Sequence, residues 1–130
     1  MLHARGEFDV QVTPKELDGP AEDPDLGRLA IVKQLRGDLV GTGHGQMLAA
    51  GGPDKGAGGY VAIERITGTL NGKEGSFVLQ HRGTMDASGY DMLVTVVPGS
   101  GTGDLGGIRG TLEILIEDGK HRYDFEYQLP

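Results

Sequence analysis

Apolar and polar residues alternate along most of this chain, and the alternation predicts β-strands that are buried on one face. Between Ala4 and Val12, small or apolar residues take every second position and polar residues the positions between them. A period of two is typical of a half-buried strand. The pattern recurs over seven further segments: Leu29–Arg36, Leu39–Ala49, Tyr60–Leu70, Lys73–Met85, Tyr90–Val97, Thr111–Glu117 and Lys120–Leu129. We therefore expect about eight strands and no amphipathic helix.

Short turn sequences join three pairs of these strands into hairpins. Asn71-Gly72 and Asp118-Gly119 tolerate the positive φ angles of a type I′ turn, and Gly37-Asp38 is interpreted as a third two-residue turn. Successive hairpins form a meander, and closing the meander removes exposed strand edges. The sequence thus predicts an all-β fold, a closed antiparallel barrel of about eight strands, with a two-sheet β-sandwich as the alternative.

The longest break in the pattern is the stretch 13–27, which holds three prolines and five acidic residues against one lysine. Because proline fixes φ and has no backbone N–H, we expect no regular element there. The stretch is interpreted as a solvated loop or as a flap over one end of the barrel. The remaining pattern is continuous, so we expect residues 1–130 to form a single barrel domain.

Charge and composition exclude several classes of function. The net charge of −7 argues against nucleic-acid binding and against binding to anionic membranes. The absence of cysteine excludes disulfides, thiol catalysis and cysteine-based zinc sites. The four histidines are scattered, so we expect no metal. The first residues lack the apolar segment of a signal peptide, which predicts a cytoplasmic protein.

One glycine-rich run matches a cofactor motif by its letters alone. Gly101 to Gly106 reads G-x-G-x-x-G, whose last glycine must open a helix in a dinucleotide-binding fold. Here the run leads directly into the strand Thr111–Glu117. We therefore interpret it as a connection between strands and expect no cofactor.

The Asn71-Gly72 turn sets the register of its hairpin, so facing residues can be counted off. The more apolar face holds the pairs Ile66–Phe77, Glu64–Leu79, Ala62–His81 and Tyr60–Gly83. Glu64 and His81 are diagonal neighbours on this face. Inside a barrel they could act as acid and base. The alternatives are a structural ion pair, or an inverted face that leaves both groups in solvent.

The same counting around Asp118-Gly119 predicts one clearly apolar face. Its pairs are Ile116–His121, Ile114–Tyr123, Leu112–Phe125 and Gly110–Tyr127. By contrast, the Asn71-Gly72 hairpin carries apolar residues on both faces. Its outer face would then be covered by the acidic loop or by a second subunit, which is the sequence's one indication of a homo-oligomer.

Several segments carry a resemblance to a known family. They are Gly59–Leu70, Gly75–His81, Thr95–Pro98, Ser100–Gly103 and Asp118–His121. With these segments the chain resembles, over essentially its whole length, a bacterial family catalogued as domain of unknown function 3224. That family is similar in fold to allene oxide cyclase, an eight-stranded antiparallel barrel. The resemblance implies the barrel and brings no activity and no catalytic residue with it.

Three functions from different classes fit these observations. The first is a binding protein that holds a small apolar or amphipathic ligand in the barrel, with Tyr60, Gln80, Tyr123 and Tyr127 as ligand-contacting residues. The second is a cofactor-free isomerase or cyclase with Glu64 and His81 as its catalytic residues, oriented by Gln80 or Tyr60. The third is a structural, oligomeric accessory protein.

Overall fold

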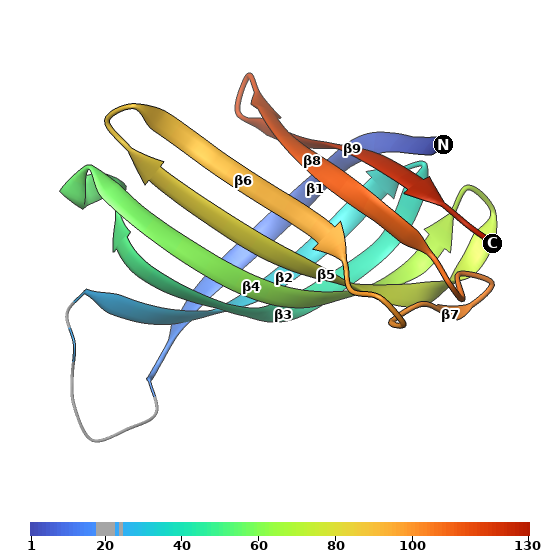
Figure 1. Ribbon diagram of the computed structural model, residues 1–130, viewed down its shortest axis with the longest axis horizontal. Coiled ribbons are helices and arrows are strands. Elements are labelled where there is room, and N and C mark those ends of the chain that lie inside the picture. The colour runs from blue at the N-terminus through green and yellow to red at the C-terminus, as the bar shows by residue number, and fades with distance from the viewer. Residues whose placement is uncertain (18–22, 24) are drawn as a thin grey trace.

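The computed structural model describes residues 1–17, 23 and 25–130, and within them one sheet of nine strands curls into a barrel (Figure 1). The strands are β1 (Leu2–Lys15), β2 (Leu26–Gly37), β3 (Leu39–Gly52), β4 (Ala57–Leu70), β5 (Lys73–Asp86), β6 (Gly89–Val96), β7 (Thr102–Gly103), β8 (Arg109–Glu117) and β9 (Lys120–Gln128). A single turn of 3-10 helix, Pro53–Lys55, separates β3 from β4. No helix in this part of the chain is long and apolar enough to cross a membrane.

Eight of the strands close the barrel, which confirms the predicted fold class over the sandwich. The order of neighbours is β4-β3-β2-β1-β9-β8-β6-β5, and β5 returns to pair with β4. All of these pairings are antiparallel, while the short β7 adds to β5 at Gly75 and Ser76. The seam between β6 and β8 is the shortest, since only Thr95 and Thr111 pair across it.

Two of the three predicted hairpin turns have the expected form and set the expected registers. Asn71 and Asp118 adopt φ of 47° and 52°, and the glycine after each also has positive φ. Positive φ at both central positions defines the type I′ turn. The β4–β5 ladder pairs Ala62 with His81 and Glu64 with Leu79, as counted from the sequence. The β8–β9 ladder likewise follows the predicted pairs.

The prediction of a two-residue turn at Gly37-Asp38 is wrong. Leu35 faces Gly41 across the β2–β3 ladder, so the connection is longer by one residue than a two-residue turn allows. The Tyr123 hydroxyl from β9 explains the longer connection. It donates to the Arg36 carbonyl at 2.7 Å and accepts from the Leu39 N–H at 3.0 Å. A side chain from another strand thus occupies the place of the missing turn hydrogen bond.

The predicted absence of regular structure over 13–27 is also wrong at both ends of that stretch. Pro14 lies within β1, opposite Leu29 of β2. Pairing of β1 with β9 ends at Phe8, so β1 has only one neighbour beyond that point and Pro14 lies on a strand edge. Edges are where strands accommodate proline. The other two prolines, Pro20 and Pro24, lie outside the described residues.

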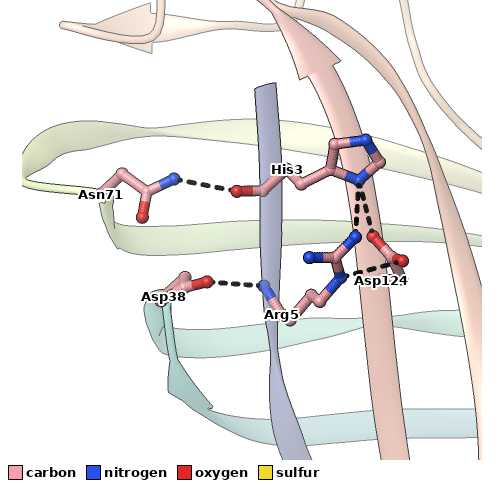
Figure 2. A network of polar contacts seen from close by, with 5 residues as sticks. All are labelled: His3, Arg5, Asp38, Asn71 and Asp124. Atoms are coloured by element: carbon pink, nitrogen blue, oxygen red, sulfur yellow. Dashed lines mark hydrogen bonds and ion pairs between the residues drawn. The ribbon is translucent and has the colours of Figure 1, made fainter. Parts of the chain in front are cut away.

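A polar network ties β1 to its neighbours at the outer surface near the hairpin turns (Figure 2). Asp124 of β9 accepts hydrogen bonds from His3 Nδ1 at 3.0 Å and from Arg5 Nε at 3.1 Å. The Arg5 backbone N–H donates to Asp38 at 2.9 Å. Asn71 Nδ2 donates to the His3 carbonyl at 3.4 Å. These contacts join β1 to β9 and to the turns after β2 and β4.

The apolar core lies at the end of the barrel where these turns gather, and the opposite end is left open. Phe77, Phe125 and Leu70 are fully buried in it. The connection between β6 and β8 adds Leu105 and Ile108 to the same core. Towards the other end, inward residues become exposed, as Ile116 and Tyr90 show at 64% each. The inner face of the barrel therefore changes from a packed core to an accessible surface along its length.

Candidate functional site

A charged cluster lies inside the barrel, between the packed core and the open end. Lys33 comes from β2, Glu64 from β4 and His81 from β5, and all three side chains are buried. Glu64 Oε1 lies 2.8 Å from Lys33 Nζ and 2.7 Å from His81 Nε2. The structure thus brings together Glu64 and His81, the two residues that the sequence analysis singled out as an acid–base pair, and places a lysine beside them.

The charges of the cluster explain how a carboxylate remains ionised inside the barrel. Burial alone would raise the pKa of Glu64, because a charged carboxylate is poorly solvated there. The hydrogen bond from His81 and the positive charge of Lys33 together outweigh burial, so the pKa lies below the ordinary value of 4.5. Lys33 Nζ also lies 4.7 Å from the centre of the Phe8 ring, a cation–π contact.

Gly43 of β3 makes room for this cluster. A Cβ atom there would lie 2.8 Å from Ile66 Cδ1 and 3.4 Å from both Glu64 Oε2 and Lys33 Cβ. Glycine thus permits the close approach of β3 to the ion pair. The second carboxylate oxygen, Oε2, is buried and has no hydrogen-bond partner among the described residues.

Tyr60 connects the cluster to the open end of the barrel. Its hydroxyl lies 3.5 Å from His81 Nδ1, at the long limit of a hydrogen bond. The Tyr60 ring packs on Gly83, its cross-strand partner, where a Cβ atom would come within 2.4 Å of the ring. Burial, followed by the negative charge of Glu64, raises the pKa of Tyr60 above its usual value, so the side chain remains a neutral phenol.

A pocket of about 810 Å³ occupies the open end, beyond Tyr60. Its walls come from β2 to β6 and from the tip of β8, and their side chains are mainly aliphatic or methionine. Leu29, Met47, Ala49, Met92 and Ile116 are among them. Asp25 and Asp86 lie in the lining too, where Asp25 pairs with Lys55 and Asp86 accepts a hydrogen bond from the Ser88 N–H at 2.8 Å.

The remaining residues predicted to contact a ligand lie away from this pocket. Gln80 is exposed on the outer surface of β5, because adjacent residues of a strand point to opposite faces. Tyr123 and Tyr127 are buried near the hairpin turns, at the other end of the barrel. The Tyr123 hydroxyl is bonded to the β2–β3 connection, and that of Tyr127 accepts from Asn71 Nδ2 at 2.7 Å.

Lys33 was not predicted as a site residue, although the chain carries a signal for it. Leu29, Ile31, Lys33 and Leu35 occupy every second position of one predicted strand. A lysine in such an apolar series predicts a buried charge, which requires a buried partner. The partner lies thirty-one residues away on β4, and that distance in sequence concealed the pair.

The three side chains form a series that runs from Glu64 through His81 to Tyr60, which lines the pocket. Glu64 orients the imidazole, and a carboxylate, an imidazole and a hydroxyl in this order are typical of acid–base sites. Among the described residues, no group of three or more histidine and acidic side chains gathers that could hold a metal ion.

The fold and the site define a class: a small closed β-barrel with a packed end, an apolar mouth and a buried polar cluster between them. Residues 4–127 match the family model described as Protein of unknown function (DUF3224). The chain therefore belongs to this family, as its sequence indicated.

A solved structure from the same family supports this assignment. It is a crystal structure at 1.84 Å resolution of a protein of unknown function from Shewanella oneidensis MR-1. The two chains share 42% sequence identity, and the alignment covers all of this chain and 98% of the other, with a TM-score of 0.92. Among curated proteins there is no match.

Proposed function

We propose that this protein binds a small amphipathic molecule in the open end of its barrel. The observation that carries the proposal is the pocket of about 810 Å³. Ligand sites are typically apolar hollows of roughly 300–1,000 Å³ with a few polar groups. Here aliphatic and methionine side chains form much of the wall, and Tyr60 is one of the few lining residues that carry a polar group.

The position of the pocket also supports a binding role. Barrels of eight strands are just wide enough to be filled by side chains or to hold one small ligand. In this barrel the side chains fill one end, where Phe77 and Phe125 stack with ring centres 5.4 Å apart. At the other end many of the residues that line the interior are glycine or alanine, so the interior there is accessible to a ligand.

The test is to fill the pocket with a side chain. Ala49 lines the pocket from β3, whereas its neighbour Leu48 lies on the outer face and is 52% exposed. The probe is N-phenyl-1-naphthylamine, a neutral fluorophore whose emission rises in apolar surroundings. We expect the wild type to bind it and Ala49→Trp to lose binding by at least about tenfold, because the indole takes the probe's place.

Leu48→Trp is the matched control, since it adds the same side chain one residue away on the other face. Its affinity for the probe should equal that of the wild type. The chain has no tryptophan of its own, so either variant also reports its folding by indole fluorescence. Absence of probe binding by the wild type, or equal binding by both variants, would contradict the proposal.

A further inference from the structure

We propose that the ligand of this barrel carries a neutral hydroxyl group, such as that of a phenol or an alcohol, which donates its hydrogen bond to the oxygen of Tyr60. This inference rests on the proposed function, because it names the chemical class of the molecule in the pocket. It follows from the direction of each hydrogen bond in the series Lys33, Glu64, His81 and Tyr60.

The donor and acceptor of each hydrogen bond can be assigned starting from Glu64. Its Oε1 atom lies within hydrogen-bond distance of Lys33 Nζ and of His81 Nε2. An ammonium group has only donors and an ionised carboxylate has only acceptors. His81 must therefore carry a proton on Nε2, since two acceptors cannot bond to each other.

The other ring nitrogen of His81 then acts as an acceptor. Lys33 and Glu64 already neutralise each other, and a second proton on His81 would leave one uncompensated positive charge in a buried cluster. In the neutral ring, one nitrogen donates and the other accepts. The group facing Nδ1 is the Tyr60 hydroxyl. Tyr60 therefore donates its one proton inward, to His81.

The phenol oxygen of Tyr60 is left with its lone pairs. Tyr60 lines the pocket and His81 does not, so Tyr60 is the member of this pair that a ligand can reach. With its own proton committed to His81, the oxygen can accept a hydrogen bond but cannot donate one. A ligand with an O–H group satisfies it, whereas an ether or a ketone does not.

The charges of the pocket exclude an anionic head group. Among the described residues that line it there is no lysine, arginine or histidine, and there are two aspartates, Asp25 and Asp86. A carboxylate or phosphate there would lack a counter-charge. Each aspartate already has a partner in the protein, Lys55 and Ser88 respectively, so a neutral donor fits better than an ammonium group.

The test compares two aromatic probes of nearly the same shape. They are 2-naphthol, which has an O–H donor, and 2-methoxynaphthalene, which has none, with affinities measured by displacement of N-phenyl-1-naphthylamine. The naphthol-to-methoxynaphthalene affinity ratio is measured in the wild type and in Tyr60→Phe. We expect the substitution to lower this ratio about three- to tenfold, the range for one hydrogen bond, and to leave methoxynaphthalene affinity unchanged.

Tyr127→Phe is the matched control. Tyr127 is buried at the packed end of the barrel and is not among the residues that line the pocket. Removing its hydroxyl should leave the affinity ratio at its wild-type value. Comparing ratios between variants cancels the difference in hydrophobicity between the probes.

Other outcomes separate this inference from the proposed function. If the wild type binds none of the probes, the proposed function fails. If it binds both naphthalenes but Tyr60→Phe keeps the wild-type ratio, the pocket stands and the inference is overturned. Stronger binding of 2-naphthoate or of 2-naphthylmethylamine than of 2-naphthol would also overturn it, because the head group would then be an anion or an ammonium.

Discussion

Glu64 is the residue on which the interior of this barrel depends most directly. Its carboxylate has one oxygen bonded to both Lys33 and His81 and is completely buried. Removing one member of a buried ion pair leaves the other charge without compensation, which costs far more than losing an exposed pair. The cluster therefore affects the free energy of unfolding, which can be measured without any ligand.

We expect Glu64→Gln to lower the free energy of unfolding by about 3 kcal/mol at neutral pH, because Lys33 would remain buried without an anion. The pKa of Glu64 lies below 4.5 in the folded protein, so its ionised form stabilises the fold above that pH. This stabilisation is lost as the pH falls through the folded-state pKa. Urea unfolding of both proteins should show the difference shrinking below about pH 4.5.

Glu113→Gln on the exposed face of β8 is the control. It removes the same charge from the surface and should change stability by less than about 0.5 kcal/mol. A loss in Glu64→Gln that is as large at pH 3 as at pH 7 would mean that volume or geometry, and not the ionised carboxylate, matters at this site.

At the scale of elements, the hairpin connections depend on contacts from distant strands to different degrees. The β4–β5 and β8–β9 turns follow from their own residues, since Asn-Gly and Asp-Gly adopt the required φ angles. The β2–β3 connection depends on the Tyr123 hydroxyl, which bonds Arg36 and Leu39. Turn chemistry therefore predicted two of the three registers correctly. The register of the β2–β3 hairpin could not be predicted without knowing that Tyr123 of β9 lies beside its connection.

We expect Tyr123→Phe to cost about 2 kcal/mol, because the buried Leu39 N–H would lose its acceptor. Tyr127→Phe is the matched comparison on the same strand. It removes a hydroxyl that accepts from Asn71, an exposed side chain that water can satisfy, so the expected loss is below about 1 kcal/mol. Thermal unfolding measures both, and equal losses would contradict this account of the β2–β3 connection.

At the scale of the whole molecule, closure of the barrel depends on a short contact. Strands β6 and β8 pair at Thr95 and Thr111 and diverge towards the open end (Figure 1). A two-sheet sandwich would leave these strands unpaired. The pairing therefore distinguishes the two folds that the strand pattern allowed.

A disulfide tests this closure directly, since the chain has no other thiol. Directly opposed residues in an antiparallel pair lie about 4.5–5.5 Å apart at Cα, within the range for a disulfide. We expect Thr95→Cys with Thr111→Cys to cross-link completely under mild oxidation, as followed by mass spectrometry. Leu93→Cys with Glu113→Cys, two residues further along each strand, should cross-link much less. Equal cross-linking would show that the seam is longer than the structure has it.

The sequence by itself determined the strands, two hairpin registers and the placing of Glu64 beside His81. These features depend on alternation and turn chemistry, which act between residues close in the chain. The sequence alone also showed the resemblance to the family. The register of the β4–β5 hairpin likewise placed Val61 and Ile63 on the outer face, and each is 53% exposed there.

Only the tertiary structure decided which cations and donors meet those residues. Lys33 of β2 joins Glu64 of β4, and Arg5 of β1 pairs with Asp124 of β9. The open pocket beyond Tyr60 likewise exists only once eight strands have closed. Pairings between strands far apart in sequence follow from closure of the whole sheet, and no local pattern encodes them.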